Sequence, residues 1–233
     1  MDTGGEPTGA LTADSLVITK LRPSETRPKL VARPRLTEKL ECDLGRRLTF
    51  LSAPAGFGKT TLLGEWLSGE ERPVAWVSLD EGDNDPARFL SYLVVALRTI
   101  EMGIGESGLS SMCSPEPLRI EALASALVNE MAALPNELVV LDDYHVIEMG
   151  PIHWVVSFLL DRLPPNVHLV IASRVEPPLP LSRLRVRDQM SEIRAVDLRF
   201  TPEEAATFLE EVMGLELSAE NVAALVPLPP PLP

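Results

Sequence analysis

The sequence contains few cysteines and no long apolar run. Cys42 and Cys113 have no CxxC partner and no histidine at ligand spacing, which excludes a disulfide framework and gives no support to a zinc site. No apolar stretch is long enough to cross a bilayer, and residues 1–14 lack the basic start and apolar core of a signal peptide. We therefore expect a cytoplasmic protein with no membrane partner.

Positive charge is also scarce. The chain has 21 Lys and Arg against 34 Asp and Glu, a net charge of −13. Because binding to a nucleic-acid backbone needs clustered basic residues, this balance argues against direct nucleic-acid binding. Four basic residues do cluster early, at Arg27, Lys29, Arg33 and Arg35. We interpret them as a solvated, proline-broken arm rather than as a DNA-binding arm.

Apolar segments of strand type alternate with segments of helical spacing along the chain. Hydrophobic residues make up 45% of the chain and charged residues 24%, as in globular domains. Strands are predicted within residues 46–53, 74–80, 137–145, 167–174 and 192–200. Helices are predicted after residue 35 and within residues 59–69, 86–97, 118–134, 152–163, 201–214 and 218–226. This alternation predicts a three-layer α/β fold around a five-stranded, mostly parallel sheet.

Two helix starts have clear capping signals. Asp85 precedes Pro86, which suits the first helical position. Thr201 is followed three residues later by Glu204, the pattern of a capping box. Residues 1–26 are rich in Gly, Thr, Ser and Pro and predict a flexible arm, whereas residues 227–233, PLPPPLP, suit neither a helix nor a central strand.

The segment APAGFGKT fits the spacing of the P-loop, GxxxxGK[ST], with Ala53 in place of the first glycine. It lies between a predicted strand and a predicted helix, which is the context this motif requires. The alternative is a chance glycine-rich turn, and this context argues against it. The predicted nucleotide-binding residues are Ala53, Pro54, Ala55, Gly56, Phe57, Gly58, Lys59, Thr60 and Thr61.

Each part of the loop has a chemical reason. Gly56 and Gly58 allow the backbone to curl and to aim its N–H groups at a phosphate. The start of the following helix adds to that anion site. Lys59 supplies a cation for the β- and γ-phosphates, and the Thr60 hydroxyl suits Mg²⁺.

A second signal is the apolar strand LVVL followed by Asp142 and Asp143. A continuous apolar run suits a central parallel strand, whose carboxyl end lies at the same sheet edge as the P-loop. We therefore predict Asp142 as a Mg²⁺ partner and Asp143 as a group that orients or deprotonates the attacking water. The alternative is a strand end whose aspartates merely open a turn.

Two further residues stand near this edge in the predicted fold. Arg174 ends the fourth predicted strand and could sense the γ-phosphate, or it could be an ordinary surface arginine, and both interpretations stay open. His145 follows the paired aspartates, where we favour a structural or coupling role over a catalytic one.

The order of sequence blocks resembles the MalT-like, LuxR-family ATP-dependent transcriptional regulators, which belong to the STAND class of signal-transduction NTPases. The blocks are LVARPRLTEKL, LTFLSAPAGFGKTTLLGEW, VAWVSLDEGDNDPARFLSYL, LVVLDDYHVI, LVIASRVEPPLPLSRLRVR and LRFTPEEAATFL. The resemblance covers residues 16–225. Generic P-loop proteins lack the W-x-S-L-D-x-x-D-N-D-P and LDDYH blocks.

The resemblance implies several properties. Val31 and Arg33 match the segment that lies against adenine in this class, which favours ATP over GTP. Arg174 matches the sensor arginine. ADP would hold a closed resting form, while ATP with an inducer would permit self-association, and slow Mg²⁺-dependent hydrolysis would reset the switch. The implied division is an arm (1–26), a P-loop NTPase domain (27–200) and the start of a helical lid with a proline-rich end (201–233).

Family members continue into winged-helix, helical-repeat and DNA-binding domains, whereas PLPPPLP replaces the expected continuation here. We therefore expect a truncated switch module that lacks the sensor and DNA-binding domains. The alternative is a nucleotide-binding module without useful turnover, which associates with itself or with full-length relatives. A P-loop kinase or transport ATPase ranks last, because neither an ABC-type signature nor an acceptor site is evident.

Overall fold

The computed structural model describes residues 16–23, 30–105 and 120–215. Within these ranges five strands form one sheet, in the order β2-β3-β4-β1-β5, and every pairing is parallel. The strands are β1 (Leu48–Ser52), β2 (Val74–Ser78), β3 (Glu137–Asp142), β4 (Val167–Ser173) and β5 (Met190–Arg194). The predicted five-stranded α/β sheet is confirmed.

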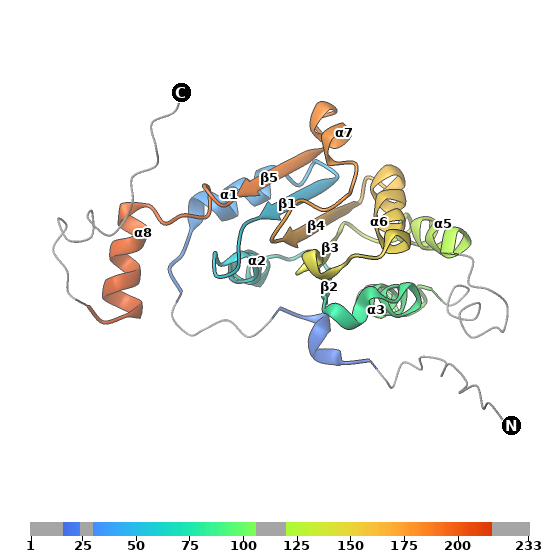
Figure 1. Cartoon of the computed structure of the whole chain (residues 1–233), viewed down its shortest axis with the longest axis horizontal. Coiled ribbons are helices and arrows are strands. Elements are labelled where there is room, and N and C mark those ends of the chain that lie inside the picture. The colour runs from blue at the N-terminus through green and yellow to red at the C-terminus, as the bar shows by residue number, and fades with distance from the viewer. Residues whose placement is uncertain (1–15, 24–29, 106–119, 216–233) are drawn as a thin grey trace, which may run out of the picture.

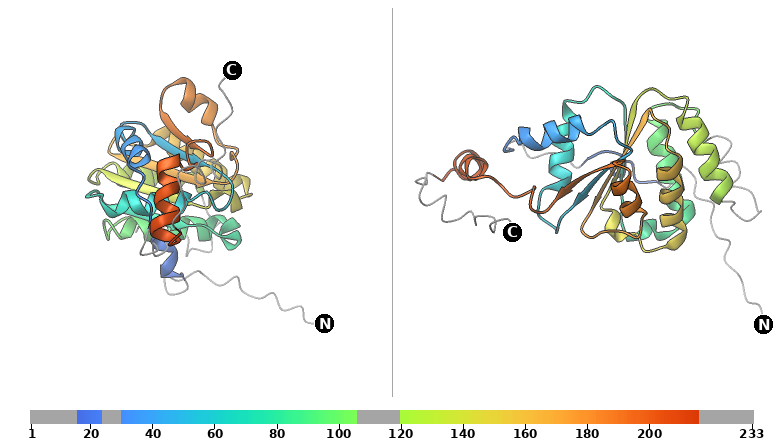
Figure 2. Two further views of the ribbon diagram at one scale, coloured as in Figure 1. Left: turned by 90° about the vertical axis from the view of Figure 1, so that its left-hand side faces the viewer. Right: turned by 90° about the horizontal axis from the view of Figure 1, so that it is seen from above.

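Helices cover both faces of the sheet, as the view along its edge shows (Figure 2). One face carries α1 (Pro34–Cys42) and α2 (Lys59–Ser68). The other carries α3 (Pro86–Arg98), α5 (Ile120–Met131) and α6 (Gly150–Arg162). Each layer buries its own apolar cluster against the sheet, so the three-layer architecture follows from the burial of both faces of every central strand.

The strand register brings the ends of four strands to one edge. Ser52 of β1 lies opposite Ser173 of β4, and Ser78 of β2 lies opposite Asp142 of β3. Strand β4 lies between β1 and β3. The loops that leave these strands therefore meet along a single edge, which in open parallel sheets is the usual place for a ligand.

Both predicted helix caps are confirmed. The Asp85 carboxylate accepts a hydrogen bond of 2.8 Å from the Arg88 N–H, and Pro86 occupies the first turn of α3. Thr201 and Glu204 form a reciprocal capping box at the start of α8 (Pro202–Thr207). These interactions are local, which explains why spacing alone predicted them.

The ends of two predicted strands were wrong, and one helix was missed. Strand β2 ends at Ser78, because Asp80 caps the 3-10 turn η3 (Glu81–Asn84). Strand β5 ends at Arg194, whose N–H donates to the Asp197 carboxylate at 2.7 Å and so begins a turn. The short helix α7 (Leu181–Val186), which packs on β5, was not predicted.

Some described segments lie at the ends of the chain. The 3-10 turn η2 (Ile18–Leu21) falls within the predicted arm but packs beside β2, with Lys20 buried. At the other end, α8 and the π-helical turn η5 (Phe208–Val212) project from the sheet (Figure 1).

The predicted helix at residues 218–226 lies outside the described residues. No helix among those described is long and apolar enough to cross a membrane.

Candidate functional site

The P-loop segment leaves β1 and wraps around the start of α2. Ala53 is buried, and its N–H donates to the Ser173 carbonyl, which ties the loop to β4. Gly56 and Gly58 have φ angles of 82° and 77°. Only glycine adopts this left-handed region without steric cost, so the loop shape depends on both glycines. Their backbone N–H groups and the start of α2 form a surface suited to phosphate.

Lys59 begins α2 and turns back over the loop. Its Nζ donates to the carbonyls of Ala53 at 2.7 Å and Pro54 at 3.2 Å, and the residue is only 6% exposed. Burial lowers the pKa of the Lys59 ammonium, and the nearby carboxylates of Asp143 and Asp142 oppose that shift. The ammonium is therefore held inside the loop, close to where anionic oxygen atoms would lie.

Thr60 and Asp142 join the loop to the end of β3. The Thr60 hydroxyl donates to Asp142 Oδ2 at 2.7 Å, and Asp142 Oδ1 accepts from the Asp143 N–H at 2.9 Å. Burial raises the pKa of the Asp142 carboxyl, although the hydrogen bond from Thr60 opposes the shift. A hydroxyl and a buried carboxylate in contact are the hard oxygen ligands that Mg²⁺ prefers. These residues fit the ion that the P-loop implies.

Asp143 and His145 follow at the same edge. Asp143 has a left-handed backbone, with φ of 55°, and a half-exposed side chain. His145 Nδ1 lies 3.7 Å from Asp143 Oδ1, which is too long for a hydrogen bond. Burial, and then the charge of Arg174, lower the pKa of the His145 imidazole, so it favours the neutral form. A neutral imidazole beside a carboxylate can accept or relay a proton.

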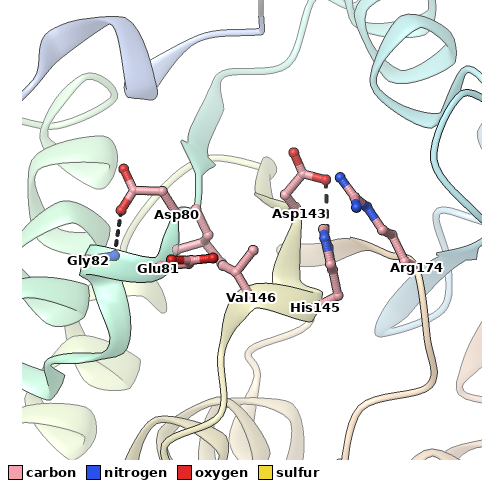
Figure 3. A pocket seen from close by; sticks show the side chains of 8 residues that line it. Asp80, Glu81, Gly82, Asp143, His145, Val146 and Arg174 are labelled. Carbon is pink, nitrogen blue, oxygen red and sulfur yellow. Dashed lines mark hydrogen bonds and ion pairs between the residues drawn. The ribbon is translucent and has the colours of Figure 1, made fainter.

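Arg174 is exposed and shares a pocket of about 400 Å³ with both of these residues. Figure 3 shows Asp143, His145 and Arg174 on one side of it and the turn of Asp80, Glu81 and Gly82 on the other. The charge of Arg174 also acts on Lys59. The structure therefore places Arg174 beside the other predicted site residues, and its contact with a γ-phosphate stays a prediction.

Val31 and Arg33 lie in the segment before α1, and both are buried, so the interpretation of Arg33 as part of a solvated arm was wrong. The Arg33 guanidinium donates to the Leu198 carbonyl at 2.5 Å and stacks 5.1 Å from the centre of the Phe200 ring. Its Nη1 lies 4.0 Å from the point where a side chain on Gly58 would begin. The segment therefore borders the P-loop, and its contact with adenine remains a prediction.

The acidic turn of residues 80–84 was not among the predicted site residues. It lies in one of the sequence blocks that carry the family resemblance, and Asp80, Glu81 and Gly82 form one wall of the pocket. The sequence signal that could have identified this turn is its position along the chain. It directly follows β2, whose end lies at the same sheet edge as those of β1, β3 and β4.

Comparison with known proteins gives close relatives, although no protein-family model matches the chain. The chain is 40% identical over 181 residues to the HTH-type transcriptional regulator MalT of Cronobacter sakazakii, covering 77% of this chain and 20% of that protein. It is 34% identical over 226 residues to the serine/threonine-protein kinase PknK of Mycobacterium tuberculosis, covering 95% and 20%. The chain thus spans about a fifth of the length of these relatives.

Among solved structures, the chain resembles a signal transduction ATPase with numerous domains (STAND) that has a tetratricopeptide repeat sensor, from Pyrococcus horikoshii. The TM-score is 0.57 at 16% identity, over 87% of this chain and 28% of the other. At this identity the likeness shows a common fold.

Proposed function

The chain is a MalT-like P-loop NTPase domain of the STAND class, and from that premise we propose that it binds ATP or ADP with Mg²⁺ and serves as a slowly hydrolysing switch module. The observation that carries the proposal is the convergence of three side chains. Lys59 is folded into the loop, and Thr60 donates to the buried Asp142 carboxylate at the end of another strand. A chance glycine-rich turn gives no reason for this juxtaposition.

Each residue has a defined part. The backbone of residues 53–61 holds the phosphates, and Lys59 balances their charge. Thr60 and Asp142 hold Mg²⁺, which supplies charge neutralisation at the phosphate oxygens. Asp143 orients or deprotonates the attacking water, and Arg174 contacts the γ-phosphate. Val31 and Arg33 border the adenine.

The relatives support a module rather than a complete activity. The same stretch matches part of a protein named as a transcriptional regulator and part of a protein named as a kinase. These two names share no reaction, so the common segment is better explained as a nucleotide-dependent switch that different proteins incorporate. Signal recognition and DNA binding are not proposed for these residues.

The test is nucleotide binding and turnover of the purified chain, with two variants and one control. Lys59→Ala should lower the affinity for Mg-ATP by about 100-fold or more, because it removes a charge-assisted contact in a closed loop. Lys39→Ala is the matched control, since Lys39 Nζ also donates to a backbone carbonyl, that of Glu192 at 2.7 Å, away from the P-loop. Unchanged affinity in Lys59→Ala would overturn the site.

Turnover separates the switch from a module that only binds. We expect wild-type turnover below about one per second, toward the slow end for switch NTPases, and a fall to background in Asp142→Asn. Equal background rates in wild type and Asp142→Asn would instead favour the binding-only module.

A further inference from the structure

The turn from Asp80 to Asn84 is held by more interactions than a connecting loop needs. Asp80 Oδ1 accepts from the Gly82 N–H and Asp83 Oδ2 accepts from the Asp80 N–H, both at 2.9 Å, so the two aspartates cap the turn reciprocally. Asp83 is fully buried. A buried carboxylate is costly unless it is paired, so the turn depends on the cations around it.

Those cations come from two elements. Lys20, in the segment before the sheet, contacts Asp80 Oδ2 at 2.9 Å, bonds to the Asp83 carboxylate and lies 4.4 Å from the centre of the Tyr92 ring. Arg88 Nε donates to Asp83 Oδ1 at 3.1 Å. Lys20 and Asp83 are 63 positions apart. The segment of residues 16–23 is therefore docked beside the turn that forms one wall of the pocket.

Asn84 connects that turn to the opposite wall. Its Nδ2 donates to the Val146 carbonyl at 2.7 Å, and its Oδ1 accepts from the N–H groups of Glu148 at 2.7 Å and Met149 at 3.3 Å. Val146 ends the 3-10 turn η4 (Tyr144–Val146), which carries His145 and is preceded by Asp143. One amide side chain thus holds the segment that presents Asp143 and His145.

The backbone conformation of Asp143 explains why the hydrogen bonds of Asn84 to the following segment are important. A non-glycine residue in the left-handed region persists only where its surroundings impose that conformation. Val146 and Ile147 close hydrogen bonds back to the carbonyls of Asp143 and Tyr144. Asn84 then fixes the far end of the same segment against η3.

We propose that Asn84 is a positioning residue for turnover: clamped by the Lys20–Asp83 cluster, it holds the Asp143–His145 turn in place across the pocket without contacting the nucleotide. The turnover part of this inference rests on the proposed function. The positioning part does not, because it concerns the order of residues 143–149 in the nucleotide-free chain.

The first experiment measures amide hydrogen exchange without nucleotide. Asn84→Ala should accelerate exchange at Glu148 and Met149, whose N–H groups lose their acceptor, while α2 is unchanged. Asn84→Asp keeps the acceptor oxygen and should restore protection at these two amides. Lys20→Met keeps the aliphatic stem beside Tyr92 and should accelerate exchange in the Asp80–Asn84 turn and at Glu148 and Met149.

Asn166→Ala is the matched control. Asn166 is also half-buried, and its Nδ2 donates to two backbone carbonyls, those of Met131 at 3.0 Å and Leu134 at 2.8 Å, beside the start of β4. It should leave exchange at Glu148 and Met149 unchanged. Wild-type exchange at these amides in Asn84→Ala, or equal acceleration in Asn166→Ala, would overturn the positioning role.

The second experiment separates turnover from affinity in the full chain. Asn84→Ala should lower kcat about 10-fold or more, because small displacements of a catalytic group are costly, while Mg-ATP affinity stays within about 3-fold, since the P-loop is built on other elements. Asn166→Ala should change neither value. Equal loss of kcat in both variants, or loss of affinity in Asn84→Ala, would contradict the inference. If the wild type binds no nucleotide, the proposed function fails, and hydrogen exchange still decides whether Asn84 holds the turn.

Discussion

The two ends of β3 each bury a carboxyl group, but in different surroundings. Glu137, at the start of the strand, is 1% exposed, and Asp142, at its end, is 2% exposed. Asp142 accepts hydrogen bonds from the Thr60 hydroxyl and the Asp143 N–H. The oxygens of Glu137 have no hydrogen-bond partner among the described residues. Burial raises the pKa of Glu137 to about 8 and raises that of Asp142 as well.

The difference teaches that burial alone does not make a carboxyl group a candidate for metal binding. At the carboxyl edge, donors and the Lys59 ammonium favour the ionised form, and the pocket beside it is open to a ligand. At the amino edge, Glu137 lies opposite Val167 of β4 with no such donors among the described residues. The uncharged acid is stable there, whereas Asp142 has the hydrogen bonds and the nearby ammonium that suit the cation-binding role we propose for it.

The largest expected effect is the pH dependence that Glu137 gives to the free energy of unfolding. Its folded pKa of about 8 lies above the ordinary value of 4.5, so the stability it contributes is fully present below about pH 4.5 and is lost as pH rises toward 8. Between about pH 5.5 and about pH 9 the free energy of unfolding should fall by up to about 3 kcal/mol from this group. Glu137→Gln should lose that part of the slope in urea unfolding. An identical slope in both proteins would mean that Glu137 is hydrated in the folded state.

The stabilisation that Mg-ATP gives should differ between variants at the two ends of β3. With Mg-ATP at about a hundred times its Kd, wild type and Glu137→Gln should both gain about 2.7 kcal/mol, whereas Asp142→Asn should gain much less. Without ligand, Asp142→Asn should be more stable than wild type at neutral pH, because it removes a buried charge. Thermal unfolding with and without Mg-ATP measures both quantities. A full ligand gain in Asp142→Asn would contradict the assignment of the metal ligand.

A smaller effect on stability should come from removing single hydrogen bonds. One of these bonds lies at the P-loop edge of the sheet and the other lies inside the sheet. Thr60→Val removes the donor to Asp142, and Thr49→Val removes the hydroxyl that lies 2.9 Å from His168 Nε2. Each should cost about 1 kcal/mol of stability. Only Thr60→Val should also weaken the dependence of nucleotide affinity on Mg²⁺, measured by titration with and without the ion. Equal Mg²⁺ dependence in both variants would remove Thr60 from the metal site.

Signals confined to a few neighbouring residues predicted most of the fold and pointed to the residues at the centre of the candidate site. The apolar run before Asp142 predicted a buried strand, and all six residues of β3 are buried. The capping residues Asp85 and Thr201 were predicted for the same reason, because a cap acts within one turn. Gly56 and Gly58 both have the left-handed backbone that a curled loop requires.

The tertiary structure alone decided which distant residues meet. The strand order places β4, and so Arg174, between the P-loop strand and Asp142. Lys20 meets Asp83 across 63 positions, and Asn84 meets Val146 across 62. Such contacts depend on how the strands and helices pack, and no local propensity or spacing encodes a partner so far along the chain. The sequence by itself therefore determined the conformation of the proposed phosphate loop and the strand that ends in its carboxylate, while packing determined the pocket beside them and the residues that hold it.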